Sequence, residues 1–510
     1  MHSLNTNNKK IAKNTIALYI RMAITMFISF FTTRITLEIL GVEDYGLNNL
    51  VSSVVALFSF LNGSMGTAIQ RFYSFEIGKG NENKLGYIFG SGLSLHLIVA
   101  IISILFMEIF AIFFLHKLNI PDNRLFAAQV VFQISIVSMG LNILSVPYTA
   151  LLRAKEEFSK IAIADVMQSI GRLIVVYLLL NIDYDHLIIL GVLNFLITLL
   201  YITFIIYIAR YYKECRHSIC WDIDIIKNIA KFISMLIVTV LASLFRDKGI
   251  IILVNMFFGL TVNAAYAVAM QIMHIVGTFV MNFKQSVVPQ IMISYGKNDL
   301  NRMHNLINVG TKITFILMLI ITLPIIFEGN YILTLWLKEP PQYSYELMCL
   351  SLININISSF TYFLYQGVHA TGNITKQQTY ISISYFLNIV VIYIAFKIGL
   401  NFYSALIISI IFSIIQCFFN IYFAYVYFNY NIKKFTIITL KCVICFIFTM
   451  FVLYIINNNI QESIFRIIIT TLATIFSSTL IGYFIILDNK EKDYCKGLIN
   501  KRKRQIYYEQ

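Results

Sequence analysis

Residues 76–88, EIGKGNENKLGYI, and residues 294–307, SYGKNDLNRMHNLI, decide the fold, because the second stretch echoes the first. Gly78 matches Gly296 at an offset of 218 residues, and a lysine follows each glycine. A shared loop at so large a separation indicates an internal duplication rather than a short tandem repeat.

Two further alignments extend this repeat. LGVEDYG (40–46) aligns without a gap with FGLTVNA (258–264) at the same offset of 218. ALLRAKEEFSKIA (150–162) resembles GVHATGNITKQQT (367–379) at an offset of 216. The first part of the chain is therefore expected to be duplicated in the second.

The segments that separate these stretches are too apolar for a soluble protein. The 510-residue chain is 58% hydrophobic and 13% charged, with a mean hydropathy of +0.76, whereas about a quarter of a soluble domain is charged. Apolar segments long enough to cross a hydrocarbon core of about 30 Å recur along it. Lipid offers no partner to backbone groups, so these segments must be helices, and we expect an all-α polytopic membrane protein. The fourteen segments run over 11–39, 46–73, 86–114, 123–151, 160–181, 186–212, 229–257, 262–290, 304–327, 344–369, 376–397, 401–428, 435–456 and 463–487.

The repeat divides these helices into two lobes of six, followed by two extra helices. Because six is even, the lobes share one orientation and should be related by a pseudo-twofold axis along the membrane normal. Parallel repeats of this kind are typical of transporters, with a site between the lobes near the midplane. The predicted boundaries are 1–212 for the first lobe, 213–428 for the second, 429–487 for helices 13 and 14, and 488–510 for a basic cytoplasmic tail.

The distribution of Lys and Arg sets the expected orientation. With the N-terminus in the cytoplasm, the inside connections carry 26 of these residues and the outside connections carry five. This asymmetry predicts that both termini are cytoplasmic. It also accounts for most of the net charge of +14, so no nucleic-acid partner is expected, and the KRKR at 501–504 is interpreted as a tail that faces membrane lipids.

Polar residues within the predicted spans fall on helical faces and could line water. The alternative is that small polar residues let helices pack closely and hydrogen-bond to one another. The candidates for a polar cavity lining are Thr25, Ser29, Asn62, Gln168, Gln271, Thr278 and Asn388.

Charged residues deep in the spans need a stronger reason, because charge in hydrocarbon is costly and usually faces a cavity or a partner. Arg172 lies about twelve residues into its helix, roughly 18 Å deep. Arg246 lies about fifteen residues beyond Lys231, roughly 22 Å deep. Asp247 is then either a partner for a charge on an adjacent helix, or Gly249 breaks the helix locally; a structural ion cluster is the alternative to a functional one.

Other titratable side chains are weaker candidates. Arg71 and Lys284 lie towards the cytoplasmic ends of their helices and could be anchors. The candidates for ion coupling are Asp165, Glu108 and His274. The sequence contains no HExxH motif, no phosphate-binding loop and no dinucleotide-binding loop, so we expect no enzyme, no catalytic residue, no cofactor and no metal site.

Four stretches together resemble a known family. They are RITLEILGVEDYGLNNLVSSVVALFSFLNGSMGTAIQRFYSFEIGKG (34–80), RDKGIIILVNMFFGLTVNAAYAVAMQ (246–271), MNFKQSVVPQI (281–291) and the LTLWL before Pro340. The chain resembles the polysaccharide transport family, the Wzx-type oligosaccharide or O-antigen flippases, in the superfamily of multidrug, oligosaccharidyl-lipid and polysaccharide exporters.

This resemblance implies two six-helix, MATE-like lobes around a cationic cavity, plus two trailing helices. It implies that the protein moves oligosaccharides linked to undecaprenyl diphosphate across the bacterial inner membrane by alternating access, for O-antigen, capsule or exopolysaccharide synthesis. A glycan polymerase and a chain-length regulator are further candidate partners. From depth and helical face, we assign the cationic role to Arg21, Arg172 and Arg246, with Lys248, Arg71 and Lys284 behind them.

Two other functions compete with this interpretation. A cation-coupled drug and toxin exporter of the same superfamily would need acidic residues to hold cations, whereas the charges within the spans are mainly basic. A membrane glycan polymerase normally needs a sizeable outer loop, whereas the longest outside connection, about 328–343, is under twenty residues.

Overall fold

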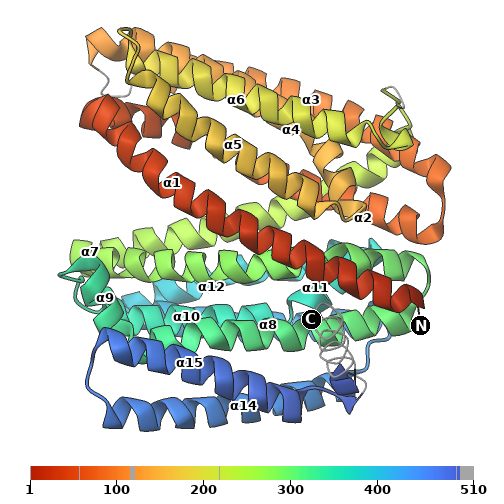
Figure 1. The fold of residues 1–510 in the computed structure, drawn as a ribbon, viewed down its shortest axis with the longest axis vertical. Coiled ribbons are helices and arrows are strands. Elements are labelled where there is room, and N and C mark those ends of the chain that lie inside the picture. The colour runs from red at the N-terminus through yellow and green to blue at the C-terminus, as the bar shows by residue number, and fades with distance from the viewer. Residues whose placement is uncertain (1, 57, 115–120, 217–218, 490, 494–510) are drawn as a thin grey trace, which may run out of the picture. The chain divides into compact units, whose positions relative to one another are not determined.

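The computed structural model describes residues 2–56, 58–114, 121–216, 219–489 and 491–493, and the regular structure within these ranges is helical (Figure 1). The long helices are α1 (His2–Ala56), α2 (Ser59–Lys79), α3 (Glu82–Phe114), α4 (Leu125–Ala154), α5 (Phe158–Leu179), α6 (His186–Ala209), α7 (Ile223–Gly296), α8 (Leu300–Phe327), α9 (Gly329–Leu337), α10 (Ser344–Phe360), α11 (Tyr362–Thr371), α12 (Thr375–Lys397), α13 (Ser404–Phe428), α14 (Ile432–Asn459) and α15 (Ile464–Ile481). Short helical turns are η2 (Asp122–Arg124), η3 (Lys213–Arg216) and η4 (Gly482–Ile486).

Twelve helical stretches among the described residues are long and apolar enough to cross a membrane. One of them, α7, has 74 residues and would be roughly 110 Å long if straight, too long for one crossing. Its backbone leaves the helical region at Gly259, and that of α1 does so at Gly41. Divided at these glycines, the helices account for the predicted series, with the second predicted span formed by the end of α1 together with α2.

The internal repeat is visible in the backbone itself. Gly41 and Gly259, separated by the offset of 218, have nearly the same dihedral angles, with φ of 70° and 80° and ψ of 176° and −173°. Essentially only glycine adopts this conformation. Positive φ recurs at two more equivalent pairs, Gly80 with Asn298 and Glu156 with Gly372. The repeat predicted from sequence therefore describes where the chain kinks and where its helices end.

The chain divides into two compact units. Unit 1 comprises Met1–Leu241 and Gln285–Leu300, and unit 2 comprises Ala242–Lys284 and Asn301–Gln510. The lobe boundaries at 212 and 428 stay a prediction. Most of the predicted basic tail, from residue 494 onward, and Lys490 lie outside the described residues.

Each unit has its own apolar core. In unit 1, Phe132, Ile143 and Leu179 belong to a buried cluster that joins α1, α3, α4, α5 and α6. In unit 2, one cluster includes Val254 and Leu352, and a second packs α14 and α15 against α8. Many large apolar side chains remain exposed, as expected for helices that face lipid.

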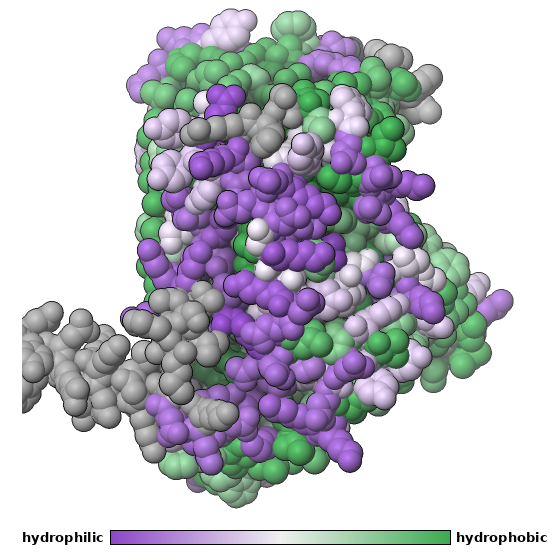
Figure 2. All heavy atoms as spheres, turned by 90° about the vertical axis from the view of Figure 1, so that its right-hand side faces the viewer, coloured by the Kyte–Doolittle hydropathy of each residue, from purple (hydrophilic) through white to green (hydrophobic). Residues whose placement is uncertain are grey.

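Hydrophilic side chains gather at one end of the helices. Figure 2 looks at the end where the N-terminal part of α1 lies in Figure 1, and this end is covered largely by hydrophilic residues, with hydrophobic residues at the margins of the view. The connections after α2 and α4 carry the lysines that the charge distribution assigns to the cytoplasm. We call this hydrophilic end of the helices the expected cytoplasmic end.

Candidate functional site

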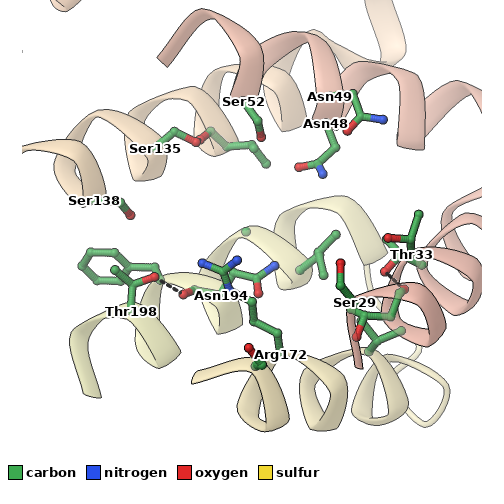
Figure 3. Close-up of a pocket in the computed structure, with 18 of the residues that line it drawn as sticks. Ser29, Thr33, Asn48, Asn49, Ser52, Ser135, Ser138, Arg172, Asn194 and Thr198 are labelled. Atoms are coloured by element: carbon green, nitrogen blue, oxygen red, sulfur yellow. Dashed lines mark hydrogen bonds between the residues drawn. The ribbon is translucent and has the colours of Figure 1, made fainter. Parts of the chain in front are cut away.

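A cavity of about 1590 Å³ lies entirely within unit 1. Its walls come from both parts of α1, from α2, and from the middle of α4, α5 and α6. Figure 3 shows polar side chains from α1, α4, α5 and α6 that converge on one space. The kink at Gly41 contributes to this arrangement, because it lets residues before and after it line the same cavity.

The lining is rich in amides and hydroxyls. An amide side chain both donates and accepts hydrogen bonds, and a hydroxyl does the same. Among the described residues that line the cavity there is no carboxylate. The polar lining residues are Thr25, Ser29, Thr32, Thr33, Thr36, Asn48, Asn49, Ser52, Asn62, Ser135, Ser138, Asn142, Ser169, Asn194 and Thr198.

Two charged side chains, Arg34 and Arg172, line the cavity. Arg34 donates to Glu38, one helical turn away, at 3.2 Å, and both side chains are exposed. Arg172 extends from α5 towards the space shared with Asn48 and Asn194 (Figure 3). It has no ion-pair or hydrogen-bond partner among the described residues, so its guanidinium group is available to a ligand.

The structure brings part of the predicted site together here. Thr25, Ser29, Asn62 and Arg172 all line the cavity. Gln168 and Arg21 do not belong to the lining, although they lie on the same two helices as those residues. Whether these residues bind a substrate stays a prediction.

Arg21 points to a partner instead of to the cavity. It donates to Asp165 at 2.8 Å, and the hydroxyl of Tyr201 on α6 donates to the other carboxylate oxygen at 3.1 Å. Both carboxylate oxygens of Asp165 thus accept from residues on neighbouring helices rather than from Arg172, two turns along its own helix.

The charges around residue 246 form a local pair in unit 2. Arg246 donates to the carboxylate of its neighbour Asp247 at 2.7 Å and lies 4.4 Å from the centre of the Tyr385 ring. Among the described residues, Asp247 pairs with its own neighbour Arg246 and with no charge on another helix. The helix α7 stays helical through Gly249, so both expectations for Asp247 were wrong. Lys248 lies exposed on the surface of the same helix.

Two other predicted cations are buried among aromatic rings. Arg71 lies 4.9 Å from the Phe72 ring and 4.7 Å from the Phe75 ring. Lys284 donates to the hydroxyl of Ser359 at 3.0 Å and lies 4.7 Å from the Tyr362 ring. Neither residue belongs to the cavity lining.

The remaining predicted residues are dispersed. Gln271, His274 and Thr278 are exposed along one face of α7 in unit 2. Glu108 accepts a hydrogen bond from Gln133 at 2.9 Å. Asn388 is 1% exposed, and neither its amide nitrogen nor its amide oxygen has a partner among the described residues.

Sequence reasoning missed the contributions of α4 and α6 to the cavity. Ser135, Ser138 and Asn142 follow one another at spacings of three and four residues, as do Asn194 and Thr198 at four. Such spacings place side chains on one helical face. The same pattern that marked the first two helices could therefore have identified these five residues.

A charged cluster in unit 1, outside the cavity lining, connects α1, η2 and the start of α6. Arg124, the last residue of η2, forms an ion pair with Asp185 at 2.6 Å. Asp185 is the N-cap residue of α6. Arg124 also forms an ion pair with Asp44. Among the described residues, no group of three or more His, Cys, Asp or Glu side chains could hold a metal ion.

Comparisons with known proteins agree with this architecture. The MatE family model matches residues 17–178 and 236–394, together more than half of the chain, with one match in each predicted repeat. None of the curated proteins compared with this sequence matches it.

Solved structures show the same fold at low identity. A MATE protein in its bent conformation superposes with a TM-score of 0.72 and 12% identity, covering 83% of this chain and 95% of that one. An outward-facing multidrug resistance MATE family transporter of the MOP superfamily gives 0.66 and 13%, covering 84% and 96%. A MOP superfamily transporter from Pyrococcus furiosus, described as having a binding pocket of reverse polarity that suggests a different function, gives 0.68 and 12%, covering 83% and 96%.

Proposed function

This chain belongs to the MatE family of membrane transporters, and we propose on that premise that it translocates an oligosaccharide linked to undecaprenyl diphosphate across the bacterial inner membrane. It is a transporter, not an enzyme. The observation that carries the proposal is the cavity of unit 1, whose described lining has amides and hydroxyls but no carboxylate. Arg172 stands among these side chains and has no partner among the described residues.

The chemistry of this lining suits a saccharide that carries an anion. Sugar hydroxyls both donate and accept hydrogen bonds, as do the side chains of Asn48, Asn142 and Asn194. A guanidinium group is planar and can form two parallel hydrogen bonds with a phosphate. The volume of about 1590 Å³ also exceeds the upper range of about 1,000 Å³ that is usual for drug-sized ligands.

A cation-coupled multidrug exporter is the second candidate function, because one of the similar structures is a multidrug resistance transporter. A cationic drug would be attracted by carboxylates, and the described lining of the cavity has arginines instead. The Pyrococcus furiosus transporter is described as a case in which reverse pocket polarity suggests a different function. That case supports reading the pocket charge, rather than the fold, as the guide to the substrate.

The proposed setting follows from the same account. The chain would lie in the inner membrane with both termini in the cytoplasm, as the distribution of Lys and Arg predicts. The lipid part of the substrate would stay in the bilayer. A glycan polymerase would consume the product on the outer side.

The test is a translocation assay in proteoliposomes that contain the purified protein and a fluorescent saccharide linked to undecaprenyl diphosphate. We expect transfer between leaflets, measured as fluorescence that becomes accessible to a membrane-impermeant quencher, and little transfer by Arg172→Ala. Transport of cationic dyes in the same vesicles, without transfer of the lipid-linked saccharide, would favour the multidrug exporter.

Deletion of the gene in the native host gives an independent check. Lipid-linked repeat units should accumulate on the cytoplasmic side, and surface glycan should be lost. Intact surface glycan in a strain without a second such transporter would contradict the proposal.

A further inference from the structure

Two glycines in unit 1 occupy equivalent positions in the two repeats and contact each other. Gly78 lies at the end of α2 and Gly296 lies at the end of α7, separated by the repeat offset of 218. A Cβ atom built on Gly78 would lie 2.9 Å from Cα of Gly296, and one built on Gly296 would lie 3.2 Å from Cα of Gly78. Neither position has room for a side chain.

The contact is symmetric in the way a twofold interface requires. The Cβ on Gly78 would collide with the carbonyl oxygen of Ile293, and the Cβ on Gly296 would collide with the carbonyl oxygen of Phe75. Phe75 and Ile293 are themselves separated by 218 residues. Equivalent residues that contact each other reciprocally lie on the twofold axis, so the two helix ends meet backbone to backbone at the pseudo-twofold axis of the repeat.

A second set of bonds holds this closed arrangement from the side. Gln290, which precedes Gly296 on α7, donates from its amide nitrogen to the carboxylate of Glu156 at 2.7 Å. The carbonyl oxygen of Glu156 accepts from Asn14 of α1 at 3.0 Å. Glu156 is 5% exposed, so these bonds are shielded from water.

The hydrogen bond between Gln290 and Glu156, which we call the latch, depends on a residue that is specific to the first repeat. Its φ of 63° is a left-handed conformation in the connection between α4 and α5, and its counterpart Gly372 has a φ of 83°. Glycine adopts this conformation without cost, whereas glutamate does not. The first repeat thus places a long carboxylate where the second has no side chain.

We propose that the contact between Gly78 and Gly296, fastened by the bond between Gln290 and Glu156, is the gate that closes the expected cytoplasmic end and must open in each transport cycle. A transporter with alternating access needs a seal that forms tightly and breaks without unfolding the helices. Backbone packing between two glycines forms such a seal, and a few side-chain hydrogen bonds bias its closure. This inference depends on the protein being a MatE family transporter and not on the identity of its substrate.

The test measures the opening directly, without any substrate. Spin labels are attached through a keto-bearing amino acid introduced at Asn81 and Lys297, both exposed beside the glycines. Double electron–electron resonance then reports the distance between them in the full chain reconstituted in lipid nanodiscs. We expect a short distance in the wild type and a shift of the distribution to longer distances in Gly78→Ala.

A matched control lies on the same helix. Gly63 of α2 has nothing within 4 Å of a built Cβ, so Gly63→Ala should keep the wild-type distance. Gln290→Ala adds no atoms and removes the latch bond, so it should also lengthen the distance, by a smaller shift, even if Gly78→Ala fails to fold. Wild-type distances in folded Gln290→Ala and Gly78→Ala, or an equal shift in Gly63→Ala, would overturn the proposal.

Discussion

Arg172 and Asn388 occupy equivalent positions in the two repeats, at an offset of 216, yet their surroundings differ. Arg172 on α5 lines a cavity of about 1590 Å³ and has no partner among the described residues. Asn388 on α12 is 1% exposed, and its amide is buried without a partner among those residues. Equivalent backbone positions thus face a polar cavity in the first repeat and lie buried in the second.

Several buried polar residues of the second repeat bond to one another. Gln377 donates to Asn420 at 3.0 Å, and Asn420 donates to Thr361 at 3.1 Å. Gln378 donates to the hydroxyl of Tyr365 at 3.1 Å. The comparison indicates that the duplication preserves kinks and helix ends, whereas the interior side chains differ between the two repeats.

The largest expected effect concerns the stability of unit 2. Arg466 of α15 is 4% exposed and donates to Glu328 at 2.9 Å, while Glu328 is 1% exposed. Arg466→Ala should lower the free energy of unfolding by about 3–5 kcal/mol, because it leaves a buried carboxylate without its cation. Unfolding by sodium dodecyl sulfate in mixed micelles measures this change.

The exposed pair between Arg34 and Glu38 provides the control for that measurement. Their side chains are 73% and 62% exposed, so Arg34→Ala should change the free energy of unfolding by less than about 1 kcal/mol. Equal effects of the two substitutions would contradict the view that buried ion pairs brace unit 2.

The next effect concerns ligand affinity. Arg172→Gln should weaken binding of a saccharide diphosphate by about 10- to 100-fold, because a hydrogen bond to a charged group contributes about 1.5–3 kcal/mol. Isothermal titration calorimetry on the purified protein measures the affinity. Arg172→Lys keeps the charge without the planar fork and should lose less affinity than Arg172→Gln; unchanged affinity in Arg172→Gln would place the ligand elsewhere.

Substitution at the equivalent position of the second repeat should leave transport intact, in contrast to Arg172→Gln. Asn388→Leu replaces a buried amide without partners by an apolar side chain of similar size, so it should leave stability unchanged or raise it by about 1 kcal/mol. Transport should continue. Loss of transport with normal stability would show that the second repeat shares the site and would break the comparison.

The smallest effect is a pH dependence at Asp488, two residues beyond η4. Burial raises the pKa of Asp488, but the positive charges of Lys312 and Lys441 outweigh it and lower this pKa below the ordinary value of 3.8. A lowered pKa stabilises the fold above pH 3.8, and this contribution is lost as the pH falls through the folded-state value.

The side chain of Asp488 is 47% exposed, so we expect a contribution below about 1 kcal/mol. Wild type should lose more free energy of unfolding than Asp488→Asn between pH 7 and pH 3.5, measured by the same detergent titration. Identical losses would show that Asp488 does not contribute to the pH dependence of stability.

The sequence was sufficient for the helices and the repeat. Long apolar runs predict spans because of the thickness of the bilayer, and the offset of 218 found in the sequence relates the two kinks, at Gly41 and Gly259. Helical spacing also placed Thr25, Ser29 and Asn62 on faces that line the cavity.

The pairing of charges could not be predicted in the same way. Periodicity tells which face of a helix a residue occupies, but not which neighbouring helix lies against that face. The bond between Arg21 and Asp165 joins residues 144 positions apart, and the bond between Arg466 and Glu328 joins residues 138 apart. Both depend on tertiary packing, and so does the lack of a partner for Arg172 among the described residues.

Mapping a photoreactive ligand tests the central claim most directly. A saccharide linked to undecaprenyl diphosphate, with a diazirine on the sugar, is crosslinked to the protein in nanodiscs, and the labelled peptides are identified by mass spectrometry. We predict labelling within 25–62, 131–142 and 169–198, lost in Arg172→Gln. Labelling of these segments by a cationic photoprobe alone, with no saccharide crosslink there, would contradict the account.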